Sequence, residues 1–513
     1  MSYPFTPISS GFNQMLQARF PAHSTVLISL LFGVFAMLVG WLCAILPLAA
    51  ALLMVAVVGA IAAMTAPLHW VTTLELFLAT VIAGAVEYFF GISQAHWIPY
   101  LLALILGLRA LMQWTQPTEK NFVANIHTKH PWFIVPLVVY FLTMIASVGF
   151  NFPPLAQLVV ALKNYLFMWG VLLAFLAVRS FDTTTAITWK AVVIVACMQL
   201  PVVLYQKFFV ASRLSNAGGA AGLSWDAISG TFGGGLLGGH SASMALFITI
   251  AVAFSLIAWR TREISLSRLG LICVLALPSV FFAEVKAVIL WLIVVGFLVF
   301  SREIRNRPFA FLGFMLGFTV LVGGIAAAYK TMYYDGDRAT EYAEVYEKQI
   351  TYFFDPDKFS AQTQEIGRTA SAVFWWEQHD LSDPIRMVLG HGLGSSRGDS
   401  SFAVGEVARN HRFRIDTSTV STLLWDVGLL GLASFVGILF LGTLESYRLA
   451  RRKDLPIHLR AGVECSSIGL FLILSGLIYN RDAIDAASVQ FLMFFFLAIL
   501  VRAKAFAARS PVE

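Results

Sequence analysis

The chain has 513 residues, of which 58% are hydrophobic and 12% are charged, and its formal net charge is +6. Soluble domains carry about 25% charged residues, so this composition excludes a large soluble core and indicates a polytopic membrane protein. The basic excess does not indicate nucleic-acid binding, because the basic residues fall in short loops between apolar segments, where membrane orientation accounts for them.

Apolar segments long enough to span a membrane occur along most of the chain. A hydrocarbon core of about 30 Å requires about 20 helical residues. By this measure we expect an all-α protein with about fourteen spans, near residues 25–45, 47–67, 70–91, 97–114, 132–150, 155–178, 187–208, 240–259, 268–283, 286–301, 308–328, 418–444, 461–480 and 485–503. About eleven spans would form an N-terminal bundle (1–329), and about three would follow a long polar loop (330–417) in residues 418–513.

The basic residues predict the orientation of these spans. With the N-terminus inside, inner loops collect basic residues over outer loops at roughly four to one, in the direction that the positive-inside rule requires. Both termini are then cytoplasmic and the 330–417 loop is external. The cations at outer span ends are Lys163, Lys207, Arg213, Lys286 and Arg481.

The segment 269–300 is the weakest part of this assignment. Basic residues at both ends, Arg268 and Arg302, require two crossings, so each helix is about 16 residues or roughly 24 Å long. The turn between them would lie below the outer surface. Glu284 and Lys286 would then sit at membrane depth, where ionisable groups are usually paired or functional.

A second external loop, residues 211–239, is rich in glycine. We interpret it as a flexible connection, because glycine accepts positive φ and lets backbones approach closely. It lacks the GxxxxGK[ST] pattern and the strand–GxGxxG–helix context of a nucleotide-binding loop. His240 stands directly after it.

The external insert 330–417 divides by charge. Acidic residues dominate from Asp335 to Asp383, and arginine and histidine dominate from Arg386 to Arg414. We expect helices at 337–352 and 364–379, lying as amphipathic caps on the outer face with Trp375 and Trp376 at the membrane interface.

The positive-inside rule accounts for basic residues on the cytoplasmic side but not for those predicted on the outer side. We therefore interpret the outer basic residues as a candidate anion-binding site. Arginine binds phosphate oxygens bidentately, so the functional interpretation is a phosphate-bearing substrate at the outer leaflet. The alternative is that these side chains snorkel or form ion pairs with Glu284, Asp482 and Asp485. The candidates for substrate binding are Lys286, Arg397, Arg412, Arg414, Arg213, His240 and Arg481.

Two histidines in the insert, His411 and His391, are candidate general bases, because imidazole titrates near neutral pH. The alternative for each is a solvated loop histidine. We expect no metal site, because no HxxH or HxxxH spacing occurs in the external segments.

Four short motifs in the second half of the chain together resemble the O-antigen ligase and O-antigen polymerase family. Gly230-Thr231-Phe232-Gly233 is similar to the family's external segment before a central helix. Val285-Lys286-Ala287 occupies the place of its Ser-Arg-Gly step, with lysine replacing arginine. Residues 389–394 (LGHGLG) resemble its external glycine motif, and residues 424–431 (LWDVGLLG) resemble the start of the helix after its large loop.

One departure from the family pattern concerns catalysis. Family ligases usually carry a His-Asn pair shortly before the last motif, where this chain has Asp416-Thr417-Ser418. The nearest candidate is Asn410-His411, six residues earlier. The difference favours a polymerase-like or exopolysaccharide enzyme over a ligase.

The resemblance implies a GT-C-like glycosyltransferase of the bacterial inner membrane. Its substrate would be a glycan on undecaprenyl pyrophosphate at the periplasmic leaflet, with a chain-length regulator and a flippase as pathway partners. Basic groups would stabilise the pyrophosphate leaving group, so neither metal nor other cofactor is expected. Lys286, Arg397, Arg412 and Arg414 would form the clamp, and His411 or His391 would be the base.

The main alternative is a lipid-linked oligosaccharide flippase or another polysaccharide transporter. Such proteins also combine many spans with internal cations. They do not require an 88-residue external insert, and the sequence shows no convincing internal repeat.

Overall fold

A computed structural model describes residues 57–114, 131–211, 227–234, 239–285, 287–301, 359–360, 365–379, 383–398 and 402–509, with scattered positions between 304 and 324. The chain divides into two compact units, Met1–Thr65 and Ala66–Glu513. In the first unit, residues 57–65 are described and helical. The predicted span at 25–45, about half of the one at 308–328 and the predicted helix at 337–352 lie outside the described residues.

The second unit confirms a helical, multi-pass architecture. Its described part contains nine helices long and apolar enough to cross a membrane and two shorter apolar ones, Leu266–Phe282 and Ala287–Val299. Each of the nine coincides with a predicted span to within a few residues. The total of fourteen stays a prediction.

The elements follow in chain order. The first half contains α4 (Leu68–Phe77), η1 (Leu78–Ile82), α5 (Ala83–Phe90), η2 (Ser93–His96), α6 (Trp97–Trp114), α8 (Ile134–Asn151), α9 (Leu155–Leu162), η4 (Lys163–Phe167), α10 (Trp169–Ala177), α11 (Phe181–Tyr205) and η5 (Gln206–Ala211). The second half contains α13 (Ser241–Arg260), α14 (Leu266–Phe282), α15 (Ala287–Val299), β1 (Phe359–Ser360), β2 (Glu365–Ile366), α19 (Arg368–Gln378), α20 (Pro384–Leu389), η6 (Ala408–Asn410), α21 (Thr419–Leu449), α22 (Ile457–Gly476), α23 (Asp482–Asp485) and α24 (Ala487–Arg509). The antiparallel pair β1–β2 matches Phe359 with Ile366.

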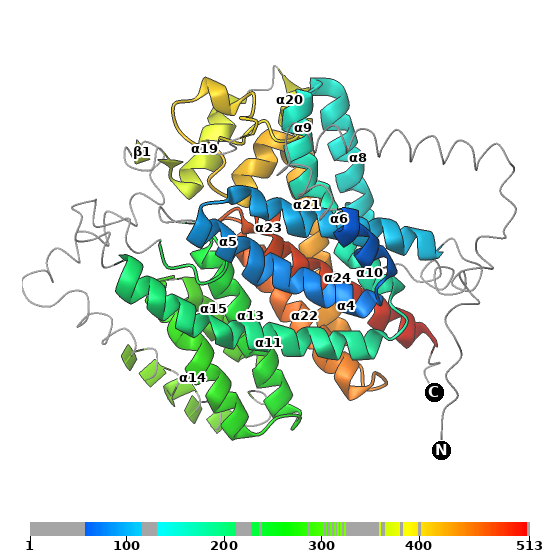
Figure 1. Cartoon of the computed structure of the whole chain (residues 1–513), viewed down its shortest axis with the longest axis vertical. Helices are drawn as coiled ribbons and strands as arrows, with labels where there is room; N and C mark the ends of the chain where they lie inside the picture. The colour runs from blue at the N-terminus through cyan, green and yellow to red at the C-terminus, as the bar shows by residue number, and fades with distance from the viewer. Residues whose placement is uncertain are drawn as a thin grey trace, which may run out of the picture. The chain divides into compact units, whose positions relative to one another are not determined.

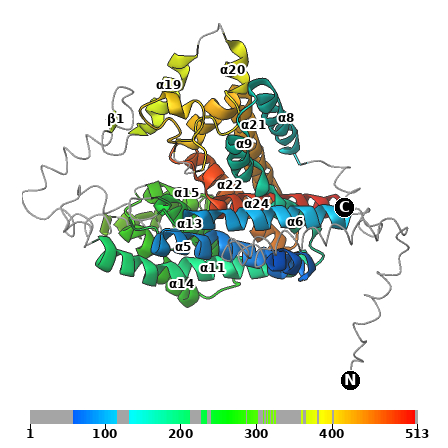
Figure 2. The same cartoon turned by 45° about the horizontal axis from the view of Figure 1, so that its top comes forward.

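The core forms around α24 and α13, whose side chains are apolar on nearly every face. The run from Phe491 to Val501 is almost entirely inaccessible. A helix that is hydrophobic all round belongs inside a bundle, and α24 packs against α10 and α22. Aromatic rings fill the space between helices: Trp189 stacks on Phe254 with ring centroids 4.1 Å apart and also meets Phe495. Figures 1 and 2 show these helices within the second unit.

The short pair α14 and α15 agrees with the prediction for residues 268–301. The helices have 17 and 13 residues, which corresponds to about 26 and 20 Å. Between them Glu284 adopts a positive φ of 56°. Its buried carboxylate lies 3.7 Å from the Lys207 amine, so at least this ionisable group is paired, as expected for a charge at membrane depth.

Two further ion pairs join charges within the apolar helices. Arg260 bonds Glu464, and Lys504 bonds Glu445. Glu75 in α4 differs: it is fully buried, and neither carboxyl oxygen has a hydrogen-bond partner among the described residues. A buried carboxyl without a partner is costly, so Glu75 is a local source of instability.

The described part of the external insert packs on the start of α21. Both α19 and α20 contact α21, and Figures 1 and 2 show them together beside its first turns. The helix predicted at 364–379 is confirmed as α19. The prediction for Trp375 is wrong: it is 1% exposed and packs with Ile415 and Trp425, because α19 turns this side toward α21. Trp376 is exposed.

Candidate functional site

Two glycine motifs of the sequence meet backbone to backbone at a bend in α21. Gly428 has φ 67° and ψ −168° inside the helix, and Gly390 has φ 73°. A Cβ on Gly428 would lie 2.4 Å from the carbonyl oxygen of Val388, and one on Gly390 would lie 2.5 Å from the amide nitrogen of Val427. Neither position has room for a side chain. The LGHGLG and LWDVGLLG segments are therefore one structural feature.

Asp426 fixes the turn that follows the first of these motifs. Its buried carboxylate accepts hydrogen bonds from the Tyr165 hydroxyl (2.8 Å) and the Gly394 amide (2.9 Å) on one oxygen. The other oxygen accepts from the Ser396 amide (2.9 Å) and the Ser395 hydroxyl (3.1 Å). Four donors satisfy the carboxylate, so the turn has a defined backbone position. Arg397 comes directly after it.

Three arginines and two aspartates then form one cluster, which we call the arginine–aspartate cluster: Arg397, Arg414, Arg481, Asp416 and Asp485. Arg397 forms an ion pair with Asp485, and Arg481 forms an ion pair with Asp416. Arg481 Nε also lies 3.4 Å from Asp485 Oδ2, and Arg414 Nε lies 3.6 Å from Asp416 Oδ1. Three positive and two negative groups leave a net charge of +1. The Asp416 and Asp485 side chains are 1% and 13% exposed, whereas the three arginines are 14–30% exposed, so the more accessible groups of the cluster are cations.

Interior helices hold Asp485 in place from the other side. The Asn164 amide donates to Asp485 Oδ1 (3.1 Å), and the Tyr100 hydroxyl donates to the Asp485 carbonyl (2.7 Å). Lys163 lies 4.8 Å from the Tyr100 ring and 5.0 Å from the Trp97 ring. A cation over aromatic faces is stabilised by the ring quadrupoles. The cluster therefore rests on α6 and η4 as well as on the insert.

The π-helical segments explain how so many polar groups reach the interior. In η4 the consecutive residues Lys163, Asn164 and Tyr165 are all buried. In a regular α-helix successive side chains turn by about 100°, which separates three neighbours. A π-bulge inserts an extra residue in the turn, and such bulges often occur at functional sites. In η5, Gln206 and Lys207 likewise make interior polar contacts.

Hydrogen bonds to neighbouring helices hold the described residues of the 211–239 loop in place. The Gln206 amide donates to the Gly230 carbonyl (2.8 Å), and the Gly234 amide donates to Glu87 (2.6 Å). Thr231 donates through its hydroxyl to the Thr80 carbonyl (2.7 Å). For residues 227–234 the prediction of a flexible connection is therefore wrong, because two helix side chains bond backbone groups of the turn and Thr231 bonds a helix carbonyl.

His240 reaches the same region from the start of α13. Its Nδ1 lies 3.8 Å from Asp482 Oδ1, on the short helix α23 that ends at Asp485. Burial by itself lowers the pKa of His240, but the hydrogen bond and charge of Asp482, with the charge of Glu87, raise the pKa above its ordinary value. The His240–Asp482 contact therefore lies beside the arginine–aspartate cluster, on the helix that carries Asp485.

His411 has the geometry of an oriented base. Its Nδ1 lies 3.0 Å from the Val407 carbonyl, which only accepts, so Nδ1 carries a hydrogen. In the neutral imidazole the lone pair is then on Nε2. The rings of Phe374 and Phe413 lie 5.4 and 5.9 Å from the His411 ring, and Trp425 lies at 5.8 Å. This aromatic enclosure orients the imidazole.

His391 is paired with a histidine that sequence reasoning missed. Its Nε2 lies 2.8 Å from Nε2 of His379, whose Nδ1 donates to the Trp375 carbonyl at 2.7 Å. One of the two facing nitrogens must donate and the other accept. Burial, the His379 charge and the nearby Arg386 together lower the pKa of His391 to about 4. Because its Nε2 is engaged, His391 is a poorer base candidate than His411.

The remaining predicted residues divide as follows. Arg412 is exposed, whereas Arg414 two positions on joins the cluster. Arg213 and Lys286 lie outside the described residues. The ion-pair alternative predicted for the outer cations holds for Arg397 and Arg481, which bind Asp485.

Asp416 and Asn164 were missed as site residues. The spacing of Arg414 and Asp416 was a signal for Asp416, because alternate residues of an extended segment share a face. No sequence signal indicated Asn164, because this residue lies inside an apolar run.

Comparison with known proteins adds no assignment: no protein-family model matches the chain, and a search of curated proteins returns no match.

Proposed function

We propose that this chain is a glycosyltransferase that polymerises or transfers glycan units carried on undecaprenyl pyrophosphate, at the periplasmic face of a bacterial inner membrane, in exopolysaccharide, capsule or O-antigen assembly. The observation that carries the proposal is the arginine–aspartate cluster. Arg397 and Arg414 come from the insert and Arg481 from the segment before α23, yet all converge on two aspartates, the buried Asp416 and the partly buried Asp485.

The chemistry of the leaving group fits this cluster. Glycosyl transfer from a lipid diphosphate releases a multiply charged pyrophosphate, which arginine forks stabilise in the transition state. Asp416 and Asp485 hold the guanidinium groups in fixed orientations before substrate arrives, which reduces the reorganisation needed during reaction. The three arginines outnumber the two aspartates that they contact, so guanidinium donors remain to bind an anion. Lys286, Arg213 and His240 would extend the same positive region.

In the proposed reaction His411 Nε2 removes the proton from an acceptor sugar hydroxyl. The hydroxyl oxygen attacks the anomeric carbon, and the bond from that carbon to the pyrophosphate oxygen breaks, with the electron pair leaving on the pyrophosphate. The arginines stabilise this charge, and His411 then releases its proton to water. No redox partner is required.

The test uses the full chain in proteoliposomes with a synthetic undecaprenyl-pyrophosphate oligosaccharide, and separates products by gel and mass spectrometry. Arg397→Gln and Arg481→Gln are expected to lower kcat by about 10²–10³, as for lost transition-state donors. His411→Gln is expected to lower kcat by about 10²–10⁴. Arg409→Gln is the matched control, because Arg409 is an exposed arginine of the same insert.

Three outcomes decide the matter. Loss of new glycosidic bonds in the three variants, with normal bonds in the control, supports the proposal. Unchanged product in all three variants refutes it. Movement of labelled lipid-linked sugar across the bilayer without bond formation by the wild type identifies a flippase instead.

A further inference from the structure

A second cationic site lies at the opposite end of α6 from the arginine–aspartate cluster. A hollow of about 370 Å³ opens between the start of α4, the end of α6 and the link from α10 to α11. Its lining residues are Leu68, His69, Arg109, Gln113, Ala177, Val178, Arg179 and Ser180. Its volume is within the range of small-molecule sites, about 300–1,000 Å³.

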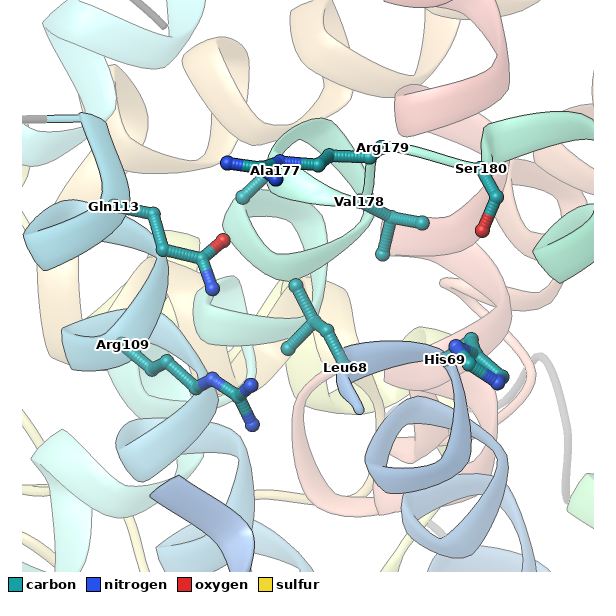
Figure 3. Close-up of a pocket in the computed structure, with 8 residues that line it drawn as sticks. All are labelled: Leu68, His69, Arg109, Gln113, Ala177, Val178, Arg179 and Ser180. Carbon is teal, nitrogen blue, oxygen red and sulfur yellow. The ribbon is translucent and has the colours of Figure 1, made fainter. Parts of the chain in front are cut away.

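The polar lining gathers on one side of this hollow. Figure 3 shows the guanidinium groups of Arg109 and Arg179 and the amide of Gln113 along the same side, with Leu68 and Val178 forming an apolar surface. Arg109 is half-buried and Arg179 is exposed, so one cation is set within the wall and the other stands at the rim. Two cations beside an apolar surface suit a phosphate group with an attached organic part.

Among the residues that the structure describes, none of those lining the hollow is an aspartate or glutamate. Asp182, the nearest acid along the chain, has its carboxylate 3.7 Å from His458 Nε2. Glu75 in α4 lies seven residues beyond Leu68, which is about 10 Å deeper along the helix axis. The N-terminal turn of α4 starts at the hollow and adds the positive end of its helix dipole beside the two guanidinium groups.

Arg502 of α24 fixes the wall that carries Arg179. It donates to the carbonyls of Leu176 (2.5 Å) and Val178 (2.8 Å), and its guanidinium lies 5.1 Å from the Phe181 ring. The two hydrogen bonds satisfy carbonyl groups at the end of α10, and the contact with Phe181 connects Arg502 to the start of α11. The wall therefore has a defined position in the absence of ligand.

This site is distinct from the arginine–aspartate cluster. Along α6, Tyr100 contacts Asp485 whereas Arg109 lines the hollow. Nine residues of helix separate them, which is about 14 Å. The charge bias of the loops predicts that Arg109 and Arg179 are on the cytoplasmic side, opposite the proposed glycosyl-transfer site.

We propose that this hollow binds a phosphate monoester or diester through Arg109 and Arg179, with Gln113 as an additional donor. Two sources present this chemistry on a cytoplasmic face: the headgroup of an anionic phospholipid and a soluble phosphate compound. The site would couple the chain to its lipid or metabolite environment on the side away from the transfer reaction.

The test uses the full chain and two probes. Inorganic phosphate is titrated by calorimetry in neutral detergent, and phosphatidylglycerol retention is measured by native mass spectrometry from phosphatidylcholine nanodiscs with and without that lipid. All measurements are made in an Arg481→Gln background, which weakens anion binding at the arginine–aspartate cluster. The variants are Arg179→Gln and the Arg109→Gln/Arg179→Gln pair, and the control is Arg268→Gln, an exposed arginine on the same predicted side.

Binding of either probe that weakens at least about tenfold in the double variant, by less in Arg179→Gln and not in the control, supports the site. Retention of the lipid alone assigns a headgroup, and binding of phosphate alone assigns a soluble ligand. Binding of neither probe, or equal binding in Arg179→Gln, the double variant and the control, overturns the proposal. The exposed position of Arg179 makes its single variant informative even if the double variant misfolds.

Discussion

Substitution of Gly428 by alanine tests the contact between the two glycine motifs. The added Cβ would lie 2.4 Å from the Val388 carbonyl oxygen and 2.6 Å from the Gly390 nitrogen. Ordinary contact begins near 3.4 Å, so the backbones must separate by about 1 Å, and such overpacking costs about 1–3 kcal/mol. The backbone angles of Gly428 are accessible almost only to glycine and add about 1–3 kcal/mol. The expected loss of stability is therefore about 2–6 kcal/mol.

The assay is thermal unfolding of the purified chain in detergent, with hydrogen exchange across residues 390–397 as the local measurement. Gly428→Ala is expected to lower Tm and to increase exchange in that segment. Gly149→Ala is the control, because no heavy atom lies within 4 Å of its added Cβ. This helical position is expected to gain up to about 1 kcal/mol. A wild-type Tm and wild-type exchange in Gly428→Ala would refute the reasoning.

Two further predictions concern buried titratable groups. The pKa of His391 is about 4 in the fold and about 6.5 when unfolded, so its stabilising contribution is complete above pH 6.5 and is lost as pH falls toward 4. The slope is up to about 1.4 kcal/mol per pH unit. His391→Asn should therefore show a smaller drop in Tm between pH 7.5 and 5.0 than the wild type, and an equal drop would contradict this assignment. Glu75→Met should raise stability by about 1–3 kcal/mol at neutral pH, because it removes a buried carboxyl whose oxygens lack hydrogen-bond partners in the described structure. A lower Tm for Glu75→Met would show that the carboxyl makes a stabilising interaction.

Local composition alone predicted most of the described helices. A span depends on the summed transfer free energy of about 20 neighbouring residues, so it is readable without knowledge of its partners. For this reason the helices from Leu68 to Ala211 and from Thr419 to Ala508 match the predicted spans. The basic second half of the insert was also visible, and from it came Arg397, Arg414 and the candidate base His411.

Tertiary packing decided which of these groups work together. Arg397 and Asp485 are 88 residues apart in sequence, and Tyr165 and Asp426 are 261 apart. Asn164 stands in an apolar run, where hydropathy gives no signal, and the π-helical turn places its side chain in the interior. The packing of α19 on α21 brings Trp375 into a core. Hydropathy is a property of one segment in a solvent, whereas an ion pair or a hollow depends on the relative positions of several segments. The sequence was therefore sufficient to predict which segments span the bilayer. Only the tertiary structure identified the partner of each polar side chain.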